Sequence, residues 1–125
     1  YELAGSAWAQ AREVAKSIPM MEKAAAKSDE GELYVRLGNV YLDGDRFTKA
    51  ADSVEKGLKK GGVKRPDQAR LVLGMAYFNL GEYDKARRAF REAGKDDRSA
   101  KYSKQWIAYV TSEEDRQREL EKDIF

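Results

Sequence analysis

The sequence predicts an all-α protein built from three stacked helical hairpins and a C-terminal capping helix. The main observation is an internal repeat, because Gly5, Gly38 and Gly74 lie 33 and 36 residues apart in similar surroundings. Each glycine is followed by an aromatic residue at the third position, an apolar or aromatic one at the ninth and a small one at the twelfth (Trp8, Val14, Ser17; Tyr41, Phe47, Ala50; Tyr77, Tyr83, Ala86). This period is typical of helical hairpins that bury their apolar faces against the next repeat.

The composition favours one helical domain and argues against several functions. The chain has 125 residues, of which 37% are charged, a balance that suits exposed helices. Its net charge of +2 provides no strong field, so we expect no nucleic-acid partner. Cysteine and histidine are absent, which removes common nucleophiles, general bases and metal ligands. We therefore expect no enzymatic activity, no metal and no cofactor.

The start of the chain indicates a fragment of a longer protein. The sequence begins with Tyr1 rather than methionine, and the repeat pattern is already under way there. No stretch reaches the roughly 18 apolar residues that a membrane-spanning helix needs, so we expect no transmembrane segment in this fragment. A signal peptide upstream is compatible with these residues.

The first repeat, residues 1–30, is truncated and degenerate. It keeps the register through Gly5 and Trp8, but the residues that precede them in a complete repeat are missing. Pro19 falls early in the second helix of this repeat, where amide groups lack intrahelical acceptors, so Ser17 is expected to cap that helix. A proline kink is the alternative.

The second repeat, residues 31–64, shows the hairpin most clearly. Bulky and small residues recur at three- and four-residue steps, as on one face of a helix (Tyr34, Leu37, Gly38, Tyr41). A turn signal over residues 43–45 follows, and a second helical stripe then begins (Phe47, Ala50, Ala51, Val54, Leu58). We expect Gly38 and Ala50 to let the two helices approach closely.

The third repeat, residues 67–98, follows a junction that contains Gly61-Gly62 and Arg65-Pro66. Its first helix carries Gly74 and Tyr77, and its second helix carries Phe90. The same stripe pattern predicts that Tyr77 and Phe90 are buried between the two helices of this hairpin.

The last segment, residues 99–125, is expected to form a capping helix and a separate polar helix. Apolar residues recur up to Val110, and the segment after it is almost wholly charged. Thr111 and Ser112, followed by Glu114, resemble the start of a new helix. A polar end of this kind keeps a terminal repeat soluble.

These motifs resemble the tetratricopeptide repeat family. The signature is Tyr34-x2-Leu37-Gly38-x2-Tyr41 with Ala50 in one unit, and Leu73-Gly74-x2-Tyr77, Gly81, Tyr83 and Ala86-x3-Phe90 in the next. The resemblance implies a right-handed superhelical stack that acts as a protein-protein interaction scaffold. In that family the first helix of each hairpin lines a concave groove, where a peptide or helix of a partner binds.

Carried over to this sequence, the family's groove positions flank the packing stripe of each first helix. They are Val35, Asn39, Leu42, Leu71, Met75, Phe78, Tyr102, Gln105 and Tyr109. The groove is apolar with a few amides, which suits an amphipathic helix or an extended apolar peptide. We expect Met75 and Phe78 to be replaceable without loss of the fold. Val35 and Leu71 argue against the cationic groove that related repeats use for acidic chaperone tails.

Two other interpretations remain open at this point. The chain could be a structural spacer or a self-association element, with its terminal helices buried in a homo-oligomer and no free groove. The basic run from Lys56 to Arg65 could bind an anionic partner, although cations at a helix end also stabilise the helix dipole. The carboxylates, among them Asp43, Asp45 and Asp96, lie at turns and caps, where acidic side chains usually serve the helix.

A second resemblance concerns the amino-acid sequence of three stretches, residues 31–38, 65–75 and 105–107. These stretches are similar to the C-terminal part of repeat proteins that accompany bacterial TonB energy-transduction systems. The resemblance implies a periplasmic location beside a TonB complex, whereas the residues themselves leave a cytoplasmic location open.

Overall fold

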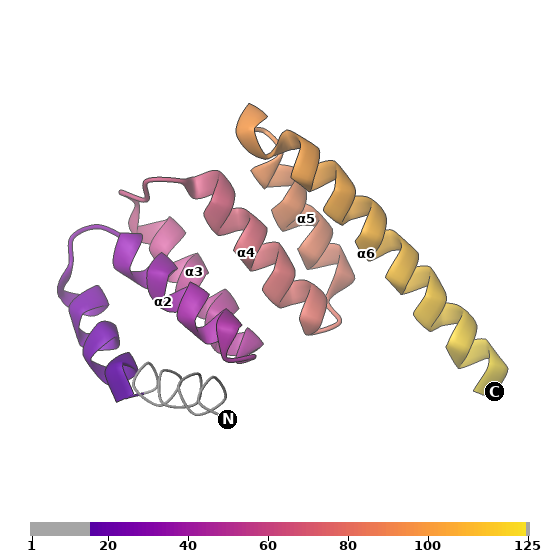
Figure 1. Ribbon diagram of the computed structural model, residues 1–125, viewed down its shortest axis with the longest axis horizontal. Helices are drawn as coiled ribbons and strands as arrows, with labels where there is room; N and C mark the ends of the chain where they lie inside the picture. The colour runs from indigo at the N-terminus through magenta and orange to yellow at the C-terminus, as the bar shows by residue number, and fades with distance from the viewer. Residues whose placement is uncertain (1–15, 125) are drawn as a thin grey trace, which may run out of the picture.

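The computed structural model describes residues 16–124, and helices are the only regular elements within them. A helix over residues 16–27 is followed by α2 (Glu32–Asp43), α3 (Phe47–Lys60), α4 (Pro66–Asn79), α5 (Tyr83–Ala93) and α6 (Asp97–Ile124), which lie side by side along the molecule (Figure 1). The all-α prediction is therefore confirmed for these residues. The first helix of the truncated repeat, with Gly5 and Trp8, lies outside the described residues.

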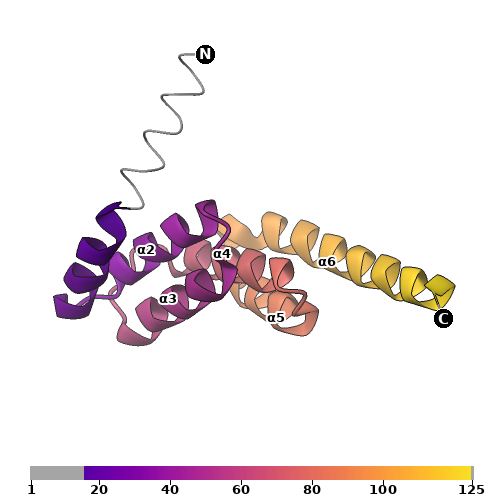
Figure 2. The ribbon, with the colours of Figure 1, turned by 90° about the horizontal axis from the view of Figure 1, so that it is seen from below.

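The helices form two layers. Turned by 90°, the structure shows α2, α4 and α6 on one side and α3 and α5 on the other (Figure 2). Each hairpin packs within itself, α2 on α3 and α4 on α5, and α3 and α5 also contact the next helix along the chain. The first helices of successive repeats thus share one face, which is the arrangement that a groove along the stack requires.

The α2–α3 hairpin closes at a tight turn and packs through its small residues. Asp45 has a φ of 60°, so the chain reverses within three residues of the end of α2. Leu37, Ala50 and Val54 are buried in the core between the helices. A Cβ placed on Gly38 would overlap the Val54 side chain, so the expected close approach of the two helices is confirmed.

The α4–α5 hairpin is built in the same way. Pro66 occupies the first turn of α4, where a missing amide costs nothing, and Gly81 makes the turn with a φ of 76°. Phe90 is fully buried, as predicted, and its ring lies against the backbone of Gly74. Tyr77 is only partly buried, because its hydroxyl reaches the edge of the hairpin and donates to Glu55 of α3.

The C-terminal segment corrects one prediction, because α6 runs from Asp97 to Ile124 without a break. No cap forms at Thr111 or Ser112. The helix continues because both sides of that point are held: Val110 is fully buried, and Glu114 pairs with Arg87 of α5 across 3.1 Å. Ion pairs within the helix, such as Arg118 with Glu114 at 3.8 Å, support the polar half that follows.

The expected cap at Ser17 is also wrong, because residues 16 and 17 are already helical. Because the residue before Ser17 already belongs to the helix, Ser17 lies inside the helix and not at the non-helical position that a capping residue occupies. The end of this helix is stabilised from the next hairpin instead. Lys60 of α3 donates hydrogen bonds of 3.2 Å to the carbonyl oxygens of Ala25 and Ala26.

Candidate partner-binding groove

A hollow of about 310 Å³ lies between α2 and α4, on the face shared by the first helices. Four of the residues expected from the sequence line it, two from each helix (Val35 and Asn39; Leu71 and Met75). Asn39 is exposed, Leu71 and Met75 are half-buried, and Val35 is only 6% exposed. The hollow therefore has an apolar floor and at least one free amide at its edge.

A second, smaller hollow of about 210 Å³ lies on α6. It is lined by Gln105, Trp106 and Tyr109, of which the sequence analysis named the first and the last. The Tyr109 ring lies 5.2 Å from the ring of Phe78 and 5.9 Å from that of Trp106. Phe78 thus connects α4 to α6 along this face through tilted and edge-on aromatic contacts.

Three of the expected groove residues also hold the stack together. Leu71, Met75 and Phe78 pack against a buried cluster that includes Phe90 and Val110. The expectation that Met75 and Phe78 can be replaced without loss of the fold is therefore wrong. The reason is that α6 lies along α4 and covers part of the face that α4 would otherwise leave open.

The remaining expected residues lie apart from the two hollows. Leu42 is half-buried and packs against the core of the α2–α3 hairpin. Tyr102 is 57% exposed on α6 and lines neither hollow. Tyr109, at 49%, is therefore the most exposed apolar side chain that lies in a hollow of this face.

The groove also contains residues that the sequence analysis did not name. Glu32, Arg65, Gln68 and Val72 line the hollow between α2 and α4, and Trp106 lines the hollow on α6. A signal for two of them was present in the spacing. Glu32 lies three residues before Val35, and Gln68 lies three residues before Leu71, so each stripe continues one helical turn further back.

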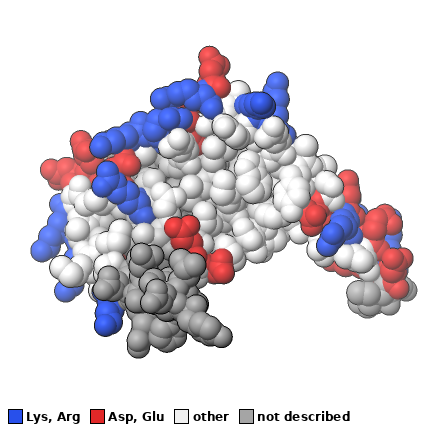
Figure 3. Space-filling model, in the orientation of Figure 1, with Lys and Arg blue, Asp and Glu red and all other residues white. Residues whose placement is uncertain are grey.

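The face that carries the groove has few charges at its centre. Figure 3 looks onto the layer of α2, α4 and α6 and shows mostly uncharged side chains across the middle. Charged side chains lie along the upper and left edges, on the far part of α6, and, for a few acidic ones, at the lower border. Two members of the basic run have internal partners: Lys60 bonds the carbonyls of residues 25 and 26, and Arg65 pairs with Asp67. Two of the basic side chains in this run therefore make contacts within the chain and stabilise the fold.

A buried polar cluster fixes the start of α4 beside this groove. Arg65 donates to both oxygens of Asp67, at 2.9 and 2.7 Å, and Ser99 of α6 donates to the same carboxylate at 2.7 Å. Asp67 is only 2% exposed, and the hydrogen bonds from Arg65 hold the pKa of its carboxyl well below the usual range. The cluster therefore ties α4 and α6 together where the hollow between α2 and α4 begins.

Residues 16–124 contain no group of three or more acidic side chains placed to hold a metal ion. One of the acids at the turns, Asp96, serves the backbone, because it accepts a hydrogen bond of 2.9 Å from the amide of Arg98 at the start of α6. Within the same part of the chain, no helix is sufficiently long and apolar to span a bilayer.

Comparison with known proteins identifies the family of the chain. No curated protein matches the sequence. Residues 35–100 match the family model described as tetratricopeptide repeat. This match covers more than half of the chain and includes α3, α4 and α5 in full. Both signature glycines within it, Gly38 and Gly74, lie where the two helices of a hairpin touch. The chain therefore belongs to the tetratricopeptide repeat family, whose members generally mediate protein-protein interactions.

Proposed function

We propose that this chain is a protein-interaction scaffold that binds a helix or an extended segment of a partner along the face formed by α2, α4 and α6. The observation that carries the proposal is the pair of hollows on that face, joined by the contact between Phe78 and Tyr109. Their lining is mostly apolar and aromatic, so burial of apolar side chains would supply most of the binding free energy. The proposal assigns no chemical reaction to the chain.

The test uses variants that remove groove contacts without removing core. Tyr102→Ser combined with Tyr109→Ser truncates two exposed side chains of α6, whereas changes at Met75 or Phe78 would also weaken the stack. Leu120→Ser is the matched control, because Leu120 is an exposed apolar residue on the same helix but beyond the groove. Peptides selected by the isolated chain from a displayed library serve as probes, and affinity is measured by titration calorimetry.

We expect the double tyrosine variant to bind the selected peptides at least about tenfold more weakly, because Tyr109 is lost from the hollow on α6 together with the exposed ring of Tyr102, two turns earlier on the same side of the helix. The Leu120 control should bind like the unchanged chain, and binding should depend little on salt. The groove proposal fails if the two tyrosines are dispensable, or if binding collapses between roughly 50 and 200 mM salt, as contacts to phosphates do.

Self-association is the alternative function, and a measurement of the oligomeric state distinguishes it from partner binding. The exposed apolar residues of α6, Tyr102, Tyr109 and Leu120, would suit a contact between two copies of the chain. Sedimentation equilibrium gives the oligomeric state directly. A dimer that the tyrosine variant dissociates would make this face an interface between copies and would replace the partner groove.

The place of action is a separate proposal. The similarity of residues 31–38, 65–75 and 105–107 to repeat proteins of TonB systems supports a periplasmic scaffold beside such a complex. Fractionation of cells that express the protein tests the compartment. Cross-linking to TonB components then tests the complex, and a purely cytoplasmic location would remove this proposal while leaving the groove proposal unchanged.

A further inference from the structure

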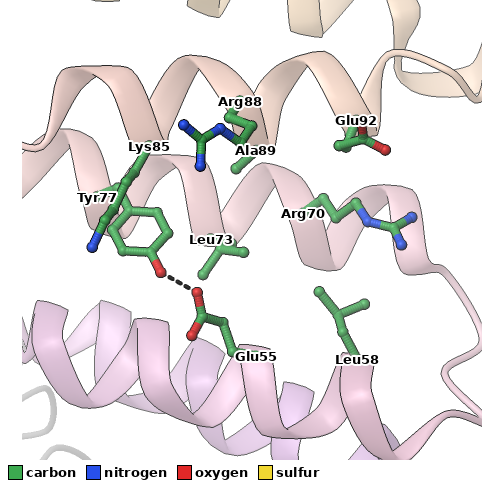
Figure 4. A pocket seen from close by; sticks show the side chains of 9 residues that line it. All are labelled: Glu55, Leu58, Arg70, Leu73, Tyr77, Lys85, Arg88, Ala89 and Glu92. Atoms are coloured by element: carbon green, nitrogen blue, oxygen red, sulfur yellow. Dashed lines mark hydrogen bonds between the residues drawn. The ribbon is translucent and has the colours of Figure 1, made fainter.

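A cleft of about 360 Å³ opens on the opposite layer, between α3 and α5, with α4 as its floor. Figure 4 shows Leu58 of α3 and Leu73 of α4 at its centre, and Ala89 of α5 above them. Two arginines also line it, Arg70 of α4 and Arg88 of α5. Their guanidinium groups point to opposite sides of Leu73, so a small apolar area lies between two cations (Figure 4).

The preceding repeat has an equivalent cleft, between the helix at residues 16–27 and α3. Tyr41 there donates its hydroxyl proton to Glu22, just as Tyr77 donates to Glu55 in the α3–α5 cleft. Each ring also has a lysine over it: Lys49 lies 5.8 Å from the Tyr41 ring and Lys85 lies 5.5 Å from the Tyr77 ring. The set of a tyrosine, a glutamate and a lysine therefore recurs in both clefts and is a feature of the repeat.

The two clefts differ at the other positions. Tyr34, Asp52 and Ser53 line the first cleft, and the residues 36 positions later that line the second are Arg70, Arg88 and Ala89. At a fourth position the charge changes in the other direction, because Lys56 of the first cleft corresponds to Glu92 of the second. The second cleft therefore has two arginines that the first lacks, and one acid in place of a lysine. A general need of the repeat fold cannot explain this difference, because both clefts are built by the same stacking of hairpins.

The two arginines make no direct pair with a carboxylate, although Arg70 interacts with Glu92 at longer range. Neither has a hydrogen bond or an ion pair among the described residues, whereas Arg65, Arg87 and Arg98 each pair with a carboxylate. The acids nearby are already engaged: Glu55 accepts from Tyr77, and Glu92 pairs with Lys95 across 2.9 Å. Arg70 is near enough to help lower the pKa of Glu92, after the larger effect of Lys95.

We propose that the α3–α5 cleft is a second docking site, which takes a peptide segment with one apolar side chain flanked by carboxylates. The apolar side chain would lie on Leu58 and Leu73, and the carboxylates would reach Arg70 and Arg88. Charge complementarity selects this partner, because two unpaired guanidinium groups favour carboxylates on both sides of an apolar residue. Because the two guanidinium groups lie on opposite sides of Leu73, two separate single charges match them better than one doubly charged phosphate.

The test uses a capped peptide with the core Glu-Leu-Glu as the probe, titrated into the ¹⁵N-labelled chain and followed by amide chemical shifts. Three matched peptides replace both Glu by Gln, Leu by Ser, or one Glu by phosphoserine. Shifts should concentrate on α3, α4 and α5 around the cleft. The Gln and Ser peptides should each bind more weakly than the probe, and the phosphoserine peptide should bind no more tightly.

Variants of the chain connect the binding to the arginines. Arg70→Gln and Arg88→Gln should each weaken binding of the probe about threefold to tenfold, as expected for partly exposed charge-assisted hydrogen bonds. Lys56→Gln is the matched control, since it removes the same charge from the equivalent cleft. Arg70→Lys with Arg88→Lys should recover part of the affinity, and unfolding midpoints verify that every variant is folded.

This site is independent of the groove on α2, α4 and α6, so the Tyr102→Ser and Tyr109→Ser variant should bind the probe normally. The proposal is overturned if the probe does not bind, if its shifts map to the groove face, or if Lys56→Gln weakens binding as much as the arginine variants. Tighter binding of the phosphoserine peptide would also overturn it, because the site would then be a phosphate site.

Discussion

Ser99 of α6 donates its hydroxyl proton to the carboxylate of Asp67 in α4 across 2.7 Å, and both side chains are buried. The two residues are 32 positions apart in the sequence, so this bond joins the first helix of one repeat to the helix that caps the stack. Arg65 completes the cluster by pairing with Asp67 from the junction between repeats. The cluster therefore sets how α6 lies on α4.

Asp67→Asn should destabilise the chain by about 1–2 kcal/mol near neutral pH, because the charge-assisted bonds to Asp67 are lost. Asp84→Asn is the control, since the Asp84 side chain is 84% exposed and its ion pair with Arg87 should contribute less than about 0.5 kcal/mol. Urea unfolding midpoints measure both. Equal losses in the two variants would show that burial of Asp67 adds nothing.

The effect of Asp67→Asn should also depend on pH. Because the folded state lowers the pKa of Asp67 below its ordinary 3.8, the stabilisation is fully present above that pH and is lost as the pH falls further. The difference in free energy of unfolding between the unchanged chain and the variant should thus be constant from pH 7 to about 5 and shrink below about 4. A difference that does not change with pH would refute this assignment.

Phe90→Ala should cost about 3–5 kcal/mol, because the ring is fully buried and a cavity would remain beside Gly74. Its ring also stacks on Trp106 of α6 with centroids 5.0 Å apart, so the change should loosen the cap as well. Leu80→Ala is the control, because Leu80 is 39% exposed and should cost under about 1 kcal/mol. Denaturant unfolding compares the two variants, and a loss below about 1 kcal/mol for Phe90→Ala would contradict the packing described.

Gly74→Ala should destabilise the third repeat by about 1–3 kcal/mol, because the added Cβ would lie 2.6 Å from the Phe90 ring, which is fully buried and stacks on Trp106. Gly44→Ala provides the contrast: its φ is −91°, and the nearest atom to an added Cβ is 3.6 Å away. That change should be neutral or stabilise slightly. Thermal unfolding followed by circular dichroism distinguishes them, and similar melting temperatures would count against close packing at Gly74.

Tyr41 should ionise only at strongly alkaline pH. Burial, together with its hydrogen bond to Glu22, raises the pKa of this tyrosine to about 12. Subtracting the ultraviolet titration of Tyr41→Phe from that of the unchanged chain isolates the group. Because the neutral form is favoured by folding, this contribution to stability is complete below about pH 10 and is lost as the pH rises towards 12.

In the Glu22→Gln variant the pKa of Tyr41 should fall but stay above the ordinary value of 10, because burial is the larger cause. A Tyr41 that titrates with the exposed tyrosines in the unchanged chain would show that the helix at residues 16–27 does not cover it.

The hairpins could be predicted from the sequence because their signals are local. Gly38 and Tyr41 lie three residues apart on one face of α2, and Ala86 and Phe90 lie four residues apart on one face of α5, so their burial follows from helical geometry. The same reasoning misjudged Thr111, whose cap-like surroundings are equally compatible with the middle of a helix. Local spacing does not show whether one continuous helix or two separate helices will form at such a point. The outcome depends on the neighbouring elements that hold both sides of it.

By itself, the sequence determined the repeat, the hairpins and the helices that share the groove face, because each depends on periodicity within some 36 residues. The tertiary structure alone decided how far Met75 and Phe78 are covered by α6, that Asp67 meets Ser99 and Arg87 meets Glu114, and that Arg70 and Arg88 remain unpaired beside one cleft. These features arise where helices distant in the sequence meet. Their geometry depends on how side chains from several elements pack together, and no single stretch of sequence contains that information.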